Sequence, residues 1–211
     1  FQKFLQGQRI LFFGAPCGFG KTTVAEGLLS GRAVLRRSGE DETPIPEGGD
    51  WDILLVDDFQ RMSEKAVQTL CGRIRRSPER RFVFLSRGAP PGCMMAFQYA
   101  GIMSVISPGE LLLDEEDIQT LFRMQKLPVT RSEIAGILKA SIGYPLGVVI
   151  TIRLMAEGMP FEPKLVSEAF REVYRYFEAA IFMPLDLTIR RFLLELAPFE
   201  TINLELAKMV S

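Results

Sequence analysis

Short apolar runs alternate with amphipathic stretches along the first 112 residues of the chain. Continuous apolar runs of this kind are typical of strands that are buried on both faces of a parallel sheet. The predicted strands cover residues 9–13, 33–36, 53–56, 82–85 and 103–106, the second being short. Helical spacing covers 22–29 and 63–76, with Ser63 as the N-cap of the second helix, and 38–50 is a Gly-, Pro- and acid-rich loop. Strands alternating with helices at this spacing predict an α/β sandwich with a parallel sheet.

The pattern changes after about Leu113, where only helices are predicted. The acidic run 114–117 stands at a helix start, where the positive end of the helix dipole favours acidic side chains, and this explains the run better than a metal site does. Further helices are predicted over 130–140, 145–156, 164–182, 187–196 and 203–210. Pro160 and Pro163 indicate a boundary between two helical groups.

Composition and charge exclude several classes of function. The 211 residues have a net charge of −1, so no overall positive field attracts a polyanion, and nucleic-acid binding by this segment alone is not expected. An arginine cluster is interpreted as a solvated helix end; its members are Arg73, Arg75, Arg76, Arg80 and Arg81. Histidine is absent, and Cys17, Cys71 and Cys93 lack metal-ligand spacing, which excludes zinc sites and histidine-based catalysis.

Unpatterned cysteines suit a reducing compartment, and neither a signal peptide nor a continuous apolar span is visible. We therefore expect a soluble, cytoplasmic protein without membrane contacts. The sequence begins at Phe1 and stops at Ser211 within a predicted helix, which suggests an excerpt of a longer protein.

A glycine-rich turn, APCGFGKT at 15–22, lies between the first strand and the first helix. It fits the P-loop pattern except that Ala15 replaces the first glycine, and such loops cradle phosphates with backbone N–H groups and a helix N-terminus. Lys21 is expected to reach the β- and γ-phosphates of ATP, or the β-phosphate of ADP, and the Thr22 hydroxyl to bind Mg²⁺. The candidate nucleotide-binding residues of this segment are Ala15, Pro16, Cys17, Gly18, Phe19, Gly20, Lys21, Thr22 and Thr23.

Two further strands end in polar residues. The strand 53–56 releases Asp57 and Asp58 at its carboxyl end, the edge at which open α/β sheets bind ligands. We expect Asp57 to hold Mg²⁺ through water, and Asp58 to orient or deprotonate an attacking water. Ser86 and Arg87 follow the strand 82–85, so Arg87 is positioned to sense the γ-phosphate. The alternative is that Arg87 is a surface arginine at a strand end.

These motifs, with the Gly-x-Pro at 143–145, resemble those of the STAND ATPases (signal-transduction ATPases with numerous domains), in particular MalT-like, LuxR-type transcriptional regulators. The segments that carry the resemblance are 15–16, 18–23, 82–91 and RRFLLELAPF at 190–199. The resemblance implies a sheet in the order 5-1-4-3-2, and Pro145 as an adenine-side contact. It implies a P-loop domain over 1–112, a helical domain over 113–160, and a winged-helix domain, incomplete at its end, over 161–211.

The resemblance further implies a switch that rests with ADP, self-associates in the ATP state and hydrolyses ATP slowly. DNA would be bound only by a C-terminal helix-turn-helix outside this sequence. One departure is that only 35 residues (22–56) separate Lys21 from Asp57, fewer than we expect for the MalT branch. Two alternatives stay open. One is an AAA-type ATP-driven remodeler or loader, and the other is a degenerate interaction module that binds nucleotide as a structural ligand and does not hydrolyse it. Residues 1–9 and Tyr144 are further candidates for contacts with adenine.

Overall fold

The computed structural model describes residues 8–41, 43–199 and 201–209. The chain divides into two compact units: the first runs to Glu116 and includes Ile142–Leu146, and the second contains Asp117–Ser141 and the residues from Gly147 onward. The segment Ile142–Leu146 thus belongs to the first unit, although in the sequence it is flanked on both sides by segments of the second. The predicted division into three domains stays a prediction.

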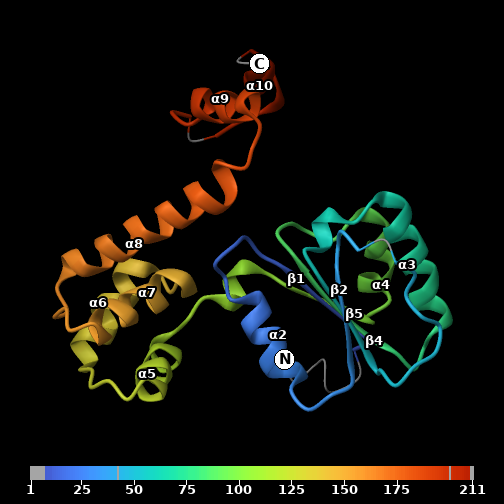
Figure 1. Ribbon diagram of the computed structural model, residues 1–211, viewed down its shortest axis with the longest axis horizontal. Coiled ribbons are helices and arrows are strands. Elements are labelled where there is room, and N and C mark those ends of the chain that lie inside the picture. Colours follow the sequence, from blue (N-terminus) through green and yellow to red (C-terminus); the bar gives the residue numbers. More distant parts are fainter. Residues whose placement is uncertain (1–7, 42, 200, 210–211) are drawn as a thin grey trace. The chain divides into compact units, whose positions relative to one another are not determined.

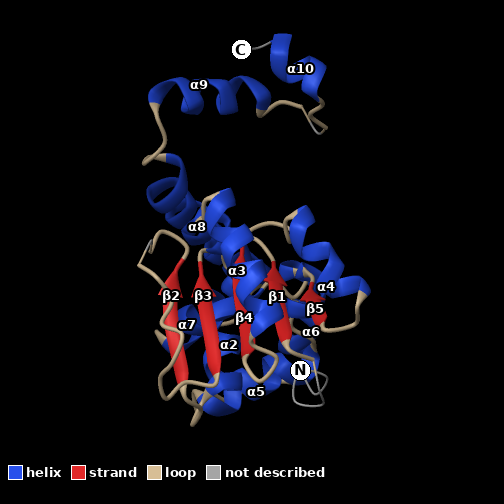
Figure 2. Cartoon of the chain, turned by 90° about the vertical axis from the view of Figure 1, so that its right-hand side faces the viewer, coloured by secondary structure: helices blue, strands red, loops and turns tan. Residues whose placement is uncertain are grey.

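The first unit is built on a parallel sheet. Within the described residues this sheet has five strands in the order β2-β3-β4-β1-β5, as Figure 2 shows. The strands are β1 (Ile10–Gly14), β2 (Val34–Ser38), β3 (Ile53–Asp57), β4 (Arg81–Ser86) and β5 (Met103–Ile106). This order confirms the predicted one, read from the opposite edge, and places β4 between β1 and β3.

The strand register brings the chemically important strand ends to one edge. Gly14 at the end of β1 pairs with Ser86 at the end of β4, and Ser38 at the end of β2 pairs with Asp57 at the end of β3. Because all five strands are parallel, the loops that follow these residues meet at the carboxyl edge of the sheet.

Each face of the sheet carries its own apolar cluster, because successive side chains of a strand point to opposite faces. Phe12 packs with Ile74 of α3 (Glu64–Arg76) and Phe97 of α4 (Met95–Tyr99), whereas Leu11 and Phe13 pack with the buried residues of α2 (Lys21–Leu29). Figure 1 shows α3 and α4 over one face and α2 over the other. The loop between β1 and α2 therefore lies at the edge of the sheet where the strands end.

Helix α3 begins and ends with side-chain contacts. The Ser63 Oγ accepts a hydrogen bond from the Ala66 N–H at 3.3 Å, which confirms the predicted N-cap. At the other end, Arg73 donates to the carbonyl of Ile45 at 2.6 Å, and the Arg80 guanidinium lies 4.0 Å from the centre of the Trp51 ring. This part of the arginine cluster is less solvated than predicted, because the loop before β3 folds against it.

Within the described residues, the regular secondary structure of the second unit is helical. They comprise most of α5 (Glu115–Met124) and of α7 (Pro145–Ala156), together with α6 (Arg131–Ser141), α8 (Pro163–Phe177), the π-helix η4 (Glu178–Phe182), α9 (Leu187–Leu196) and α10 (Leu204–Met209). Buried Ile118, Ile137 and Ala169 mark the apolar faces of α5, α6 and α8. A winged-helix domain stays a prediction. None of the helices within the described ranges is long and apolar enough to cross a membrane.

Candidate functional site

The loop between β1 and α2 owes its shape to two glycines with left-handed backbone angles. Gly18 has φ +82° and Gly20 has φ +72°, conformations that residues with a Cβ adopt at a cost. Gly20 is also the N-cap of α2, so no side chain caps this helix. In addition, the first turn of α2 contains no acidic residue. The helix start therefore offers backbone N–H groups and a positive dipole end to an anion.

The segment before α7 is hydrogen-bonded onto this loop. The Tyr144 hydroxyl donates to the Cys17 carbonyl at 3.0 Å, and the Leu146 N–H donates to the Gly18 carbonyl at 3.1 Å. A Cβ on Gly18 would lie 1.8 Å from the Tyr144 hydroxyl oxygen, and the Tyr144 ring lies 5.2 Å from that of Phe19, edge to face. Tyr144 and Pro145 are thereby placed beside the loop, and Gly18 is constrained by a neighbour as well as by its backbone.

A cleft of about 280 Å³ lies at the carboxyl edge of the sheet. It is lined by Cys17, Gly18, Gly20, Lys21, Thr22, Thr23, Asp57, Asp58, Gln60, Leu85 and Arg87. The structure thus brings most of the predicted site residues together, whereas Ala15, Pro16, Phe19 and Pro145 do not line the cleft. Its volume is near the lower end of the roughly 300–1,000 Å³ of small-molecule pockets, a size that suits the phosphate end of a nucleotide.

Lys21 supplies a cation at the loop end of the cleft. Its Nζ donates to the Ala15 carbonyl at 2.7 Å and to the Pro16 carbonyl at 2.9 Å. Partial burial lowers the pKa of Lys21 from its ordinary value, and the nearby charges of Cys17 and Asp57 oppose this shift. Phosphate oxygens would offer this half-buried ammonium the negative charge that carbonyl oxygens lack.

Asp57 and Thr22 face each other across the cleft. The Thr22 Oγ1 donates to the Asp57 Oδ2 at 3.4 Å, and the Asp58 N–H holds the other carboxylate oxygen at 2.8 Å. Among the described residues, no group of three or more Cys, Asp or Glu side chains is placed to hold a metal ion. A hydroxyl and one carboxylate fit Mg²⁺, which keeps several waters and shares phosphate oxygens in nucleotide sites.

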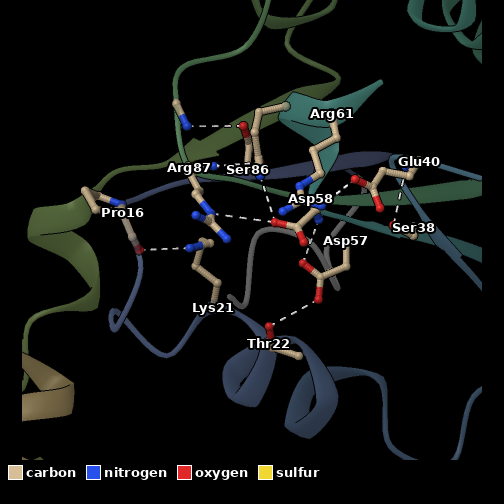
Figure 3. A network of polar contacts seen from close by, with 12 residues as sticks. Pro16, Lys21, Thr22, Ser38, Glu40, Asp57, Asp58, Arg61, Ser86 and Arg87 are labelled. Atoms are coloured by element: carbon tan, nitrogen blue, oxygen red, sulfur yellow. Dashed lines mark hydrogen bonds and ion pairs between the residues drawn. The ribbon is translucent and has the colours of Figure 1, made fainter. Parts of the chain in front are cut away.

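The backbone turns sharply at Asp58. Its φ of 49° and ψ of 41° lie in the left-handed region, which Asp tolerates better than most residues. Gly39 permits this turn, because its N–H donates to the Asp57 carbonyl at 2.7 Å and a Cβ there would lie 2.2 Å from the Asp58 carbonyl oxygen. The Asp58 side chain is directed toward Arg87, as Figure 3 shows.

A network of polar contacts joins the ends of β3 and β4 (Figure 3). The Asp58 Oδ1 lies 3.7 Å from the Arg87 Nε and accepts a hydrogen bond from the Gln60 Nε2 at 2.7 Å. The Gln60 Oε1 in turn accepts from the backbone N–H of Arg87 at 3.0 Å. Arg61, on the same short helix as Gln60, pairs with Glu40 beyond the end of β2.

Sequence reasoning missed Gln60, because the 3-10 helix η1 (Phe59–Arg61) that carries it has no periodic pattern. It also missed the bond between Tyr144 and Cys17, which lie 127 residues apart. Arg9, within a candidate adenine-side segment, instead donates to the carbonyls of Ile74 and Ser77 at 2.7 Å each, at the end of α3. Residues 1–7 of that segment lie outside the described residues.

No family model and no curated protein sequence matches the chain. Several solved structures are similar to it. The RuvB Holliday junction branch migration motor of Thermotoga maritima gives a TM-score of 0.56 at 15% identity, over 96% of this chain and 73% of that one. A STAND protein with a tetratricopeptide repeat sensor from Pyrococcus horikoshii gives 0.56 at 16% identity, over 98% of this chain and 35% of the other.

A Walker-type ATPase of Pyrococcus abyssi gives a TM-score of 0.54 at 11% identity, over 99% of this chain and 85% of that chain. At these identities the likeness concerns the fold. The sheet order, the glycine loop and these neighbours agree, and the chain therefore has the fold of the P-loop ATPases.

Proposed function

We propose that the chain is a nucleotide-dependent switch that binds ADP or ATP with Mg²⁺ and hydrolyses ATP slowly. The observation that carries the proposal is the meeting of Lys21, Thr22, Asp57, Asp58 and Arg87 in one cleft at the carboxyl edge of the sheet. These residues come from the start of α2 and from the ends of β3 and β4. Their convergence beside an uncapped helix start supports phosphate binding more strongly than any one of them does alone.

Each side chain has a role that its position supports. The loop N–H groups and Lys21 bind the phosphates. Thr22 and Asp57 would hold Mg²⁺, which would supply positive charge against the phosphates. Asp58 orients the attacking water. Arg87 stabilises the negative charge that grows on the γ-phosphate.

The Asp58–Arg87 pair supplies the difference between nucleotides that a switch requires. A ligand shifts a conformational equilibrium only through unequal affinity for the two states. The γ-phosphate competes with Asp58 for the Arg87 guanidinium, whereas ADP offers no such competitor. ATP therefore releases Asp58 toward water and ADP leaves the pair in place.

We further propose that the switch regulates transcription in a MalT-like, LuxR-type protein. The motif resemblance supports this role, and the STAND protein among the structural neighbours is compatible with it. In this proposal residues 1–112, 113–160 and 161–211 form the nucleotide-binding, helical and winged-helix domains. Pro145 contacts the adenine side, the ATP form self-associates, and DNA is bound by a helix-turn-helix outside this sequence. The cytoplasm is the compartment that this role requires.

The RuvB likeness, which extends over most of the chain, favours a second candidate function, an AAA-type motor or loader. That function predicts brisk turnover which rises with protein concentration, because an arginine from a neighbouring copy completes the site. A switch predicts slow turnover and tight retention of ADP. Steady-state hydrolysis at several protein concentrations separates the two.

Calorimetric titration of nucleotide-stripped protein with Mg²⁺–ADP and Mg²⁺–ATP tests the proposed function. We expect micromolar or tighter binding that favours ADP. Lys21→Ala should weaken binding of both nucleotides by about 100-fold or more, because it removes the ammonium group that binds the phosphates. Lys65→Ala, at an exposed position of α3, is the matched control and should bind as the parent does. A folded parent that binds neither nucleotide would overturn the proposal.

A further inference from the structure

We infer that Gln60 is a positioning residue that keeps Asp58 and Arg87 in register; this inference rests on the proposed function. Gln60 is the member of the network that bonds to both strand ends. Its amide nitrogen donates to the Asp58 carboxylate at 2.7 Å, and its amide oxygen accepts from the Arg87 N–H at 3.0 Å. A primary amide is suited to this place, because it carries a donor and an acceptor on one planar group.

Gln60 itself is held by a rigid base. The preceding residue, Phe59, is buried, and its ring lies 5.4 Å from that of Phe12 and 4.9 Å from that of Phe84, both on central strands. The Arg61 N–H donates to the Asp58 carbonyl at 2.8 Å and closes the turn. The short helix η1 is thus anchored to the sheet core, although the Gln60 side chain is exposed to the cleft.

This arrangement separates two functions of Arg87. The backbone of Arg87 is fixed by Gln60, whereas its guanidinium is held by the longer 3.7 Å contact with Asp58. When the guanidinium turns to a phosphate, Gln60 still donates to Asp58 and preserves the direction of the carboxylate. Without Gln60, the direction of the Asp58 carboxylate is set by its contact with the Arg87 guanidinium. Asp58 then competes better against the γ-phosphate for that guanidinium.

The test compares ATP and ADP affinities in Gln60→Leu, Gln60→Glu and the control Gln68→Leu, an exposed glutamine of α3. Gln60→Leu should leave ADP affinity within about twofold of the parent and lower the ATP-to-ADP affinity ratio by about 10-fold, the size of one hydrogen bond to a charged group. Gln68→Leu should change neither quantity.

Gln60→Glu provides a rescue that a merely structural role would not show. At neutral pH the introduced carboxylate cannot donate to Asp58, but the protonated acid can, so the affinity ratio should recover as the solution becomes mildly acidic. The charged groups around this position are Lys21, Glu40, Asp57, Asp58, Arg61, Glu64 and Arg87. The same pH series on the parent and on Gln68→Leu corrects for the titration of these surrounding charged groups.

The outcomes separate the inference from the proposed function. If the parent binds nucleotide and both Gln60 variants keep its affinity ratio at every pH, the inference is wrong and the proposed function stands. If a folded parent binds no nucleotide, both fall together. A lowered ratio in Gln60→Leu, with recovery of Gln60→Glu in acid, supports the positioning role.

A second inference rests on two thiols outside the cleft and needs no nucleotide. The Sγ atoms of Cys71, buried on α3, and Cys93, exposed in η2 (Gly92–Met94), lie 4.0 Å apart. We propose that this pair is a site of oxidative modification that forms an intramolecular disulfide. An S–S bond of about 2.0 Å requires the sulfurs to approach. Cys93 is exposed, and an added Cβ at the nearby Gly88 or Gly92 would meet no atom within 4 Å, so the surroundings leave room for this approach.

A hydroperoxide is the oxidant in this proposal. The exposed Cys93 thiolate attacks one oxygen of hydrogen peroxide and becomes a sulfenic acid. The O–O bond breaks, and the other oxygen leaves as hydroxide, which takes up a proton to become water. The Cys71 sulfur then attacks Cys93, loses its proton and displaces a second water, so two thiols and one peroxide give one disulfide and two waters. Burial raises the pKa of Cys71 to about 11, which suits it to the second step rather than the first.

Thiol titration before and after hydrogen peroxide treatment, with mass analysis of peptides, tests this proposal. The three thiols of the parent should fall to one, with Cys71 and Cys93 in a single cross-linked peptide. Cys17→Ser, the matched control, should also lose two thiols, whereas Cys71→Ser and Cys93→Ser should form no such peptide. Retention of all three thiols, or over-oxidation of Cys93 without a cross-link, would show that the pair is not a disulfide site.

Discussion

Among single residues, the two left-handed glycines of the phosphate loop differ in what limits a substitution. At Gly18 the Tyr144 hydroxyl oxygen lies 1.8 Å from an added Cβ, whereas at Gly20 no atom lies within 4 Å. A side chain at Gly20 therefore meets only backbone strain. At Gly18 it must also push Tyr144 away from the loop and break the bond to Cys17.

We predict that Gly18→Ala destabilises the protein more than Gly20→Ala does. Gly20→Ala should cost about 1–2 kcal/mol, the penalty of a left-handed residue with a Cβ. Gly18→Ala should add about 1 kcal/mol or more for the lost hydrogen bond and the displaced ring. Urea denaturation of both variants beside the parent measures the difference. Equal losses would mean that the Tyr144 contact contributes nothing to stability.

Individual residues also explain which elements could be predicted. Strands β3 and β4 were predicted because their central positions are apolar on both faces, a pattern that few other structures produce. Helices α7 and α9 begin and end as predicted, and Pro145 at the first position of α7 is a residue typical of a helix start. The helix predicted over 164–182 is α-helical only to Phe177, and the π-helix η4 completes it. Five residues with that bonding leave no distinct period in the sequence.

At the scale of elements, helix α6 begins with a reciprocal capping box. The Thr130 N–H donates to the Glu133 carboxylate at 2.7 Å, and the Glu133 N–H donates to the Thr130 Oγ1 at 3.3 Å. The hydrogen bonds from the Thr130 side chain and backbone lower the pKa of Glu133 below its ordinary value. The cap therefore favours the charged carboxylate in the folded state.

We predict that Thr130→Ala destabilises the protein by about 1 kcal/mol at neutral pH, whereas Thr130→Ser retains the cap. Because the folded pKa of Glu133 is depressed, its contribution is complete above the ordinary value of 4.5 and is lost as the pH falls through the folded pKa. The difference between parent and Thr130→Ala should shrink over that acidic range. Denaturation at several pH values measures it, and a difference that stays constant into acid would contradict the ionic part of the cap.

At the scale of the whole molecule, most of the cleft could be predicted because the carboxyl ends of parallel strands meet at one edge. Asp57, Asp58 and Arg87 could be predicted as site residues because each follows a buried strand. Gln60 and the Tyr144 hydroxyl could not be predicted in the same way. Their partners are set by the turn at Asp58 and by contact between segments 127 residues apart, neither of which leaves a local pattern.

The contact between Tyr144 and the phosphate loop leads to a prediction about the link between ligand and helix. The hydroxyl bonds to Cys17, and two residues later the Leu146 N–H bonds to Gly18, within the first turn of α7. From Gly147 onward α7 belongs to the second unit, so one continuous helix connects the loop to that unit. We therefore expect a shift of the loop carbonyls on phosphate binding to act on the start of this helix.

We predict that Tyr144→Phe, which removes only the hydroxyl, weakens ADP binding by about 3- to 10-fold, the size of one neutral hydrogen bond. Hydrogen exchange at the first turn of α7 should slow on addition of ADP in the parent, and less so in the variant, because one hydrogen bond between the loop and the helix start is then lost. Tyr99→Phe, whose ring is 84% exposed in the same unit, is the matched control and should behave as the parent. If both variants bind ADP equally and protect α7 equally, the hydroxyl bond does not transmit the state of the loop. A selective loss in Tyr144→Phe would place the coupling on the Cys17 carbonyl, since the ring and the backbone bond from Leu146 are unchanged.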